Sequence, residues 1–198
     1  MLISLRHPDN SIAPATKLLQ VRNGYTASTN ESLENLNRAI GDAVAKLGRD
    51  KLLGNVRVGR HSGVEVPWAP SRFLLLPPEQ RQKVTQVYCS AIACGYSHCS
   101  TDLWAPISRM VLDASYEATL WVAALEAAAA HIHINSDGAS GVNDRELPAG
   151  IGRVVLTFLG GGVFQNEPEW IYGAIARACV ELQDVGLEVI ITHHCGVS

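Results

Sequence analysis

The chain has 198 residues, of which 47% are hydrophobic, and a formal net charge of −3. This length suits one folded domain, and this composition argues against a disordered chain. The slight negative charge disfavours nucleic acid as a partner, because phosphate backbones are bound by broad basic surfaces, although a local loop can still bind a small anion.

The cysteines and the apolar segments argue against two further classes of protein. Cys89, Cys94 and Cys99 are spaced by five residues, which fits neither a zinc knuckle nor a CxxC redox pair. We therefore expect free thiols in a reducing compartment. No signal peptide is visible and no apolar run approaches about 20 residues, so we expect a cytoplasmic protein with no membrane partner.

In the first half of the chain, the patterns predict a strand, a helix and a second strand. Residues 1–15 are expected to form an N-terminal arm, 17–21 a strand that ends at an Asn23-Gly24 turn, and 25–30 a loop. A helix should begin with Thr29 or Asn30 as its N-cap and end at Gly48, because apolar residues recur at steps of three and four. Residues 56–66 indicate a strand and 67–82 a connection.

The second half alternates strands and helices. We expect a buried central strand over 84–93 and a long helix from 102 to about 131. A polar, glycine-rich insertion over 135–150 should then precede a strand over 153–159, a helix over 168–182 and a last strand over 187–192. This alternation predicts a single α/β domain over 1–198, with a mostly parallel or mixed sheet covered by helices on both faces.

The strongest functional signal is the run Gly160-Gly161-Gly162, which lies between a predicted strand and the start of a helix near Asn166. Glycines permit positive φ and let backbone N–H groups approach a ligand, and the helix N-terminus favours an anion. Phe164 could stack on a ribose or a base. The spacing matches neither the P-loop nor the Rossmann fingerprint. The alternative is a tight strand-to-helix turn that binds nothing.

Two other segments carry polar side chains at predicted strand ends. The first runs from Asn23 to the helix start, where asparagines could hold ribose hydroxyls and a carboxylate could orient a water. Glu31 is the candidate for that carboxylate and Glu34 the second choice. The alternative for Asn30 and Glu31 is plain helix capping. Ser90 ends the predicted central strand. His98 and Cys99, which are adjacent in the sequence, leave a cysteine-dependent enzyme as a weaker alternative.

The order of these segments resembles the macrodomain, a family that binds ADP-ribose. The residues that carry the resemblance are YEATL, then LTFLGGGVFQN, then WIYGAIARA, then LEVIIT. The resemblance implies a three-layer α/β/α fold with a mixed sheet flanked by helices, a diphosphate clamp over 160–164 and a ribose next to Phe164. Gln165 stands where the family has glycine. Asn23 falls on the asparagine of the family's N-A-A-N stretch, but TASTNESLENLN replaces the glycine run that follows it.

The sequence VTQVYCSAIACGYS resembles a divergent branch of the family more than its typical members. That branch resembles bacterial effector enzymes that remove ADP-ribose from arginine of ubiquitin. This implies an ADP-ribosylhydrolase that acts on an ADP-ribosylated protein such as ubiquitin, in the cytoplasm or a host cytosol, without cofactor or metal. A non-catalytic reader of ADP-ribose and a partner-binding domain are the alternatives. The ligand contacts expected are Asn23, Asn30, Ser90, Gly160, Gly161, Gly162, Val163, Phe164 and Asn166.

Overall fold

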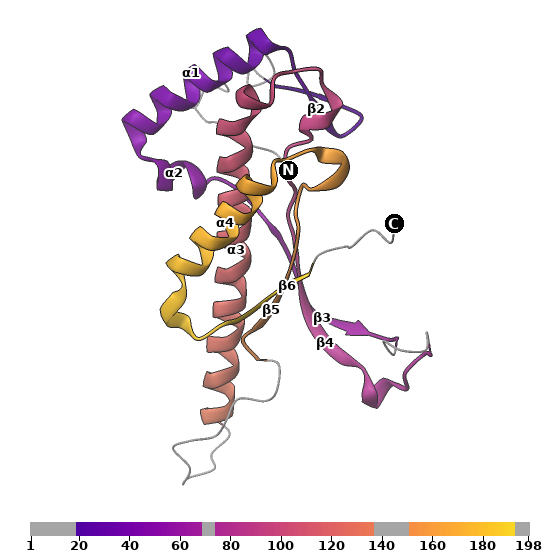
Figure 1. Cartoon of the computed structure of the whole chain (residues 1–198). Helices are drawn as coiled ribbons and strands as arrows, with labels where there is room; N and C mark the ends of the chain where they lie inside the picture. Colours follow the sequence, from indigo (N-terminus) through magenta and orange to yellow (C-terminus); the bar gives the residue numbers. More distant parts are fainter. Residues whose placement is uncertain (1–18, 69–73, 137–150, 193–198) are drawn as a thin grey trace.

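The computed structural model describes residues 19–68, 74–136 and 151–192. It is a mixed α/β structure in which the helices outweigh three small sheets (Figure 1). The predicted arm over 1–15 and nearly all of the predicted insertion over 135–150 lie outside the described residues.

The helices form the body of the molecule. They are α1 (Asn30–Leu47), α2 (Arg49–Leu53), α3 (Thr101–Ser136) and α4 (Pro168–Glu181). The 36-residue α3 runs most of the length of the view in Figure 1, with α4 beside it. It continues past the predicted end near residue 131. No helix in the three described ranges combines the length and the apolar composition that a membrane crossing needs.

The ends of α1 are set by local sequence, as predicted. The hydroxyl of Thr29 accepts a hydrogen bond from the backbone N–H of Ser32, which satisfies one of the free donors of the first turn. At the other end, Gly48 has a φ of 83°, a backbone conformation that glycine adopts at little cost.

The strands pair in three separate sheets. These are β1 (Gln20–Arg22) with β2 (Tyr25–Ala27), β3 (Gly59–Val66) with β4 (Gln82–Tyr88), and β5 (Arg153–Thr157) with β6 (Glu188–Thr192). The first two pairs are antiparallel and the third is parallel. The expected continuous sheet is therefore not found among the described strands, because no ladder joins one pair to the next.

The predicted buried strand over 84–93 is wrong in its position. β4 ends at Tyr88, and most of its residues are exposed because its only ladder partner in the described chain is β3. The buried part comes after it, over residues 91–94, where the chain is not a strand. Ala91, Ile92 and Cys94 belong to the core that the helices form.

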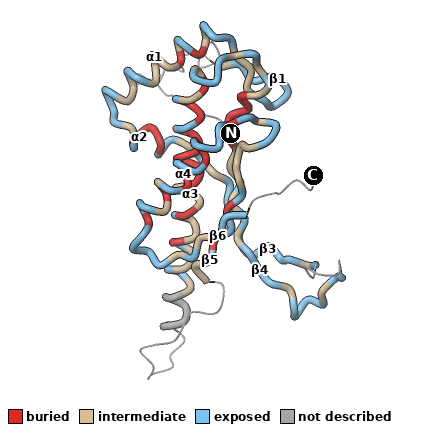
Figure 2. The backbone as a smooth tube through the Cα atoms, viewed as in Figure 1, coloured by how far each residue is buried: buried red, intermediate tan, exposed pale blue. Residues whose placement is uncertain are grey.

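The hydrophobic core lies between α3, α4 and α1, together with 91–94 and the inward side of β5 (Figure 2). Its fully buried side chains include Trp104, Leu33, Leu112, Leu120 and Ile171. By contrast, every residue of β3 and β4 is exposed or half-buried. This hairpin projects away from the helical body (Figure 1).

Candidate functional site

Two distant parts of the sequence meet near the start of α1. The Thr26 hydroxyl accepts a hydrogen bond from the Ala93 N–H at 3.0 Å. The N–H of Ser28 donates to the Ser97 hydroxyl at 3.0 Å, and the N–H of Ser100 donates to Oδ1 of Asn30 at 3.2 Å. These bonds fix the β1–β2 hairpin and the beginning of α1 against residues 93–100.

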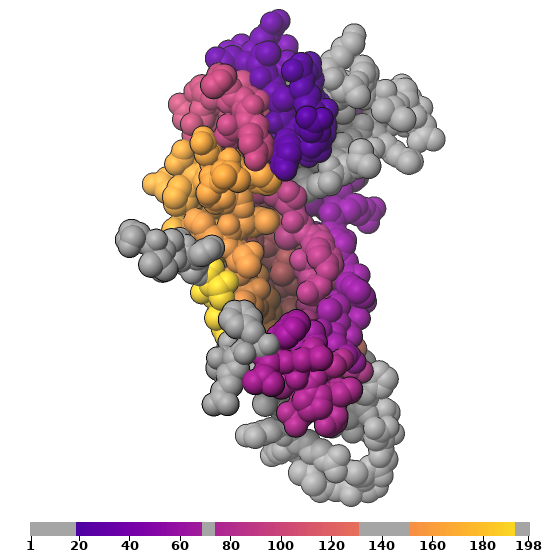
Figure 3. Space-filling view, turned by 90° about the vertical axis from the view of Figure 1, so that its right-hand side faces the viewer, coloured from indigo at the N-terminus to yellow at the C-terminus, as the bar shows by residue number. Residues whose placement is uncertain are grey.

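The glycine loop, residues 158–166 between β5 and α4, packs in close contact with residues 91–95. A Cβ atom on Gly160 would lie 2.4 Å from the Cβ of Ala91, and one on Gly95 would lie 2.7 Å from the carbonyl oxygen of Val163. Gly160 also has a φ of 82°. Glycine is therefore required on both sides of this contact, which places the loop directly against residues 91–95. Figure 3 shows this orange segment beside the pink segment that leads into α3.

The loop retains backbone donors that a ligand could use. A short 3₁₀ turn covers Gly162–Phe164, and the N–H of Gly161 donates to the Phe158 carbonyl. Within the described ranges, the N–H groups of Gly160, Gly162 and Val163 donate to no backbone or side-chain acceptor. Those of Gly162 and Val163 are successive, and successive free backbone N–H groups allow a loop to bind an anion without a basic side chain.

Asn166 holds the far end of the loop. Its side-chain nitrogen donates to the carbonyls of Ile92 at 2.8 Å and Gly160 at 3.1 Å. The residue is 4% exposed, and its Oδ1 has no partner among the described residues. Asn166 was predicted as a ligand contact, and the structure gives its amide nitrogen two partners within the protein.

The rings of Tyr25 and Tyr96 pack with Phe164 of the glycine loop. The centroid of Tyr25 is 4.7 Å from that of Tyr96 and 6.1 Å from that of Phe164, and the ring of Tyr96 lies 6.0 Å from Phe164. All three contacts are edge-to-face. Tyr25 and Tyr96 remain about half exposed, so this aromatic cluster presents ring surface to solvent next to the unpaired N–H groups.

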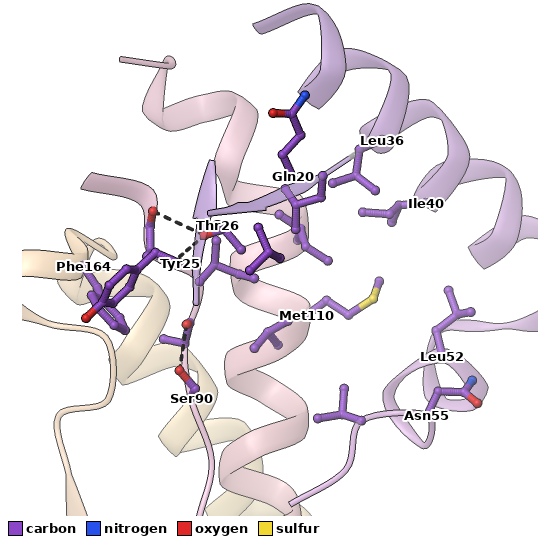
Figure 4. A pocket seen from close by; sticks show the side chains of 18 of the residues that line it. Gln20, Tyr25, Thr26, Leu36, Ile40, Leu52, Asn55, Ser90, Met110 and Phe164 are labelled. Carbon is purple, nitrogen blue, oxygen red and sulfur yellow. Dashed lines mark hydrogen bonds between the residues drawn. The ribbon is translucent and has the colours of Figure 1, made fainter. Parts of the chain in front are cut away.

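A cavity of about 950 Å³ extends from this cluster between α1 and α3 (Figure 4). Ser90 and Phe164 lie toward one end of it in the view, and Leu52 and Asn55 toward the other. Most of the lining side chains are apolar, and Arg22 supplies a positive charge. A planar or apolar group could occupy such a space while a polar group stayed at the loop.

The predicted site residues fall into two groups. Ser90 and Phe164 line the cavity, and the glycines with Val163 form the adjoining loop. The others stand apart. Asn23 is exposed in the β1–β2 turn with a φ of 51°, and Asn30 is used in fixing Ser100. Glu31 and Glu34 are exposed on α1 and are not among the residues that line the cavity.

The residues that the sequence analysis missed are mostly tyrosines. Tyr25 and Tyr96 supply the two exposed rings of the aromatic cluster, and Tyr116 bonds to the beginning of the glycine loop. Tyr25 directly follows the Asn-Gly turn, so recognising a hairpin there would have placed it at a strand start. Tyr116 begins the YEATL segment, but nothing in that segment indicates a contact with the glycine loop.

The cysteines give no support to a cysteine-dependent enzyme. Cys89, Cys94, Cys99 and Cys179 are free thiols, as expected, and Cys195 lies outside the described residues. Burial raises the pKa of the Cys89, Cys94 and Cys99 thiols, which disfavours the reactive thiolate. Within the described chain, no cluster of histidine, cysteine and carboxylate side chains could hold a metal ion.

The chain matches no model of a protein family, and comparison with curated proteins and with solved structures gives no match either.

Proposed function

We propose that the protein binds ADP-ribose, with the diphosphate at the glycine loop and an attached ring system at the aromatic cluster and the cavity. One observation carries the proposal. The unpaired N–H groups of Gly160, Gly162 and Val163 belong to the same loop as Phe164, whose ring packs with two tyrosines and lines an apolar cavity. A dinucleotide-like ligand has this combination of chemistry, an anionic centre between flat, partly apolar ends.

The loop can stabilise a bound diphosphate through hydrogen bonds from its backbone. Backbone N–H groups donate to phosphate oxygens without the desolvation cost of a buried cation. Arg22, which lines the cavity, adds a positive charge on the side of the hairpin. This arrangement agrees with a chain whose net charge is −3, because the attraction for the anion is local.

We further propose that the ligand is released from a modified protein, so that the chain is a divergent macrodomain with ADP-ribosylhydrolase activity. A water would attack the anomeric carbon, the bond from that carbon to the side-chain nitrogen would break, and the nitrogen would leave with a proton. Glu31 is the candidate for orienting the water, with Glu34 next. An arginine of ubiquitin is the substrate that the sequence resemblance suggests, in the cytoplasm or a host cytosol.

Binding is tested by calorimetric titration of ADP-ribose into three proteins: wild type, Gly161→Glu and Gly161→Gln. Gly161 has a φ of −67°, so a side chain causes no backbone strain, and in both variants its Cβ displaces the Phe158 ring from 3.0 Å. The two variants differ only in charge. We expect the glutamate variant to bind at least tenfold more weakly than the glutamine variant, about 1.4 kcal/mol. Folded wild-type protein that binds no ADP-ribose would refute the proposal, as would equal affinities of the two variants.

A non-catalytic reader is the second candidate, because Glu31 and Glu34 do not line the cavity. Incubation with an ADP-ribosylated protein separates the two functions. A hydrolase releases free ADP-ribose with turnover, and Glu31→Gln slows the release while leaving the affinity for ADP-ribose unchanged. A reader binds the modified protein and protects the linkage.

A further inference from the structure

The hydroxyl of Tyr116 bonds to the backbone at the junction between β5 and the glycine loop. It donates to the carbonyl oxygen of Thr157, the last residue of β5, at 2.9 Å. It also accepts a hydrogen bond from the N–H of Leu159 at 2.8 Å. Tyr116 belongs to α3, so one side chain of the longest helix bonds to both backbone groups, which also bond to each other, from the Leu159 N–H to the Thr157 carbonyl at 2.9 Å.

This bridge fixes the start of the loop next to Gly160, where the loop packs most closely against residues 91–95. Leu159 directly precedes Gly160, whose missing Cβ allows contact with Ala91 at a distance that no side chain would permit. A shift at Leu159 would therefore move Gly160 against, or away from, the segment over 91–95. Asn166 holds the opposite end of the loop through the Gly160 carbonyl.

The bridge is not itself a reactive group. Tyr116 is 3% exposed, and both the donor and the acceptor capacity of its hydroxyl are used within the protein. Burial raises the pKa of Tyr116 to about 12, although the hydrogen bond from Leu159 opposes the rise. The hydroxyl therefore remains protonated and donates to Thr157 at any pH at which the protein would work.

We propose that Tyr116 is a positioning residue for anion binding: through Thr157 and Leu159 it sets the glycine loop in the conformation that presents the N–H groups of the loop to a diphosphate. This inference rests on the proposed function of the loop. Tyr116, in the middle of α3, would therefore affect ligand affinity without contacting the ligand.

The test is Tyr116→Phe, which removes the hydroxyl and keeps the ring. ADP-ribose and adenosine are each titrated into wild type and variant, because adenosine lacks the diphosphate. We expect the variant to lose at least tenfold in affinity for ADP-ribose and less than twofold for adenosine. The matched control is Thr119→Val on the same helix, which removes a hydroxyl bonded to the Ser115 carbonyl and to the Cys89 side chain and not to the loop. It should leave both affinities unchanged.

A second measurement needs no ligand. Amide hydrogen exchange should be at least tenfold faster at Leu159 in Tyr116→Phe, and the amide chemical shifts over 160–164 should move, while Thr119→Val leaves both unchanged. If wild type binds neither ligand, the proposed function fails and the exchange data alone decide whether Tyr116 sets the loop. An unchanged loop spectrum in Tyr116→Phe would overturn the inference, as would equal losses for ADP-ribose and adenosine.

Discussion

Gly160 and Gly162 share a backbone conformation but differ in their surroundings. Both have a positive φ, 82° and 67°. A Cβ on Gly160 would meet Ala91 at 2.4 Å, whereas one on Gly162 would meet nothing within 4 Å. One glycine is thus required for both its conformation and its close approach, and the other for its conformation alone.

This difference predicts unequal effects of the same substitution. Gly162→Ala should lower the free energy of unfolding by roughly 1–2 kcal/mol, the cost of a left-handed conformation for a residue with a side chain. Gly160→Ala carries that cost and the overpacking against Ala91, about 1–3 kcal/mol more. Urea unfolding of both variants measures the difference. Equal losses would mean that the loop does not pack on Ala91 as closely as the structure has it.

The β3–β4 hairpin is bound to α3 through the carboxylate of Glu126. Glu126 Oε1 accepts hydrogen bonds from Arg60 Nε at 2.8 Å, from the Ser62 hydroxyl at 3.0 Å and from the Thr85 hydroxyl at 3.1 Å. The hydrogen bond from Arg60 lowers the pKa of Glu126 below its usual 4.5, against burial, which raises it. The two hydroxyls lower it further.

The contact should therefore depend on pH in a defined direction. Because the pKa of Glu126 is lower in the folded protein, its contribution to stability is present above pH 4.5 and is lost as the pH falls through the lowered value. The amide chemical shifts of Arg60, Ser62 and Thr85, followed from pH 7 to 3.5, should change with a midpoint below 4.5. Glu126→Gln should show the altered shifts already at pH 7. A midpoint at or above 4.5 would contradict the contact.

Elements specified by local sequence could be predicted, and pairings could not. Thr29 and Gly48 define α1 through groups within a few residues, so its bounds follow from the sequence. The partner of a strand depends on distant residues. The apolar run around Ala91 therefore suggested a central strand, although it is buried as a non-strand segment in a mainly helical core. β2 was missed because its three residues are too short for an alternating pattern.

The same limit applies to the site. The glycine run was recognisable because its residue types are unusual at any position, and Phe164 could be assigned with it. The partners of the loop come from far along the chain. Tyr25 lies near the N-terminal end of the described residues and Tyr116 lies inside a helix. Only the folded arrangement reveals that these tyrosines reach residues 157–164.

For the molecule as a whole, α3 joins parts that do not pair with one another. On α3, Glu126 bonds to the β3–β4 hairpin and Tyr116 bonds to the end of β5. Glu117, on the same helix, forms an ion pair with Arg177 of α4 at 2.5 Å. The core gathers around the first part of this helix, while the hairpin contributes no buried residue. The protein should therefore consist of a stable helical body and a hairpin that opens more easily.

Native-state hydrogen exchange measures this difference. After correction for intrinsic rates, amides of the β3–β4 ladder should exchange at least tenfold faster than those around Val111 and Leu112, because the hairpin can open without exposing the core. Ile171→Val, at a fully buried position of α4, should lower core protection by roughly 1 kcal/mol and leave the hairpin unchanged. Glu126→Gln should do the reverse. If both substitutions changed both sets of amides alike, hairpin and body would unfold as one unit, and α3 would transmit the stability of each part to the other.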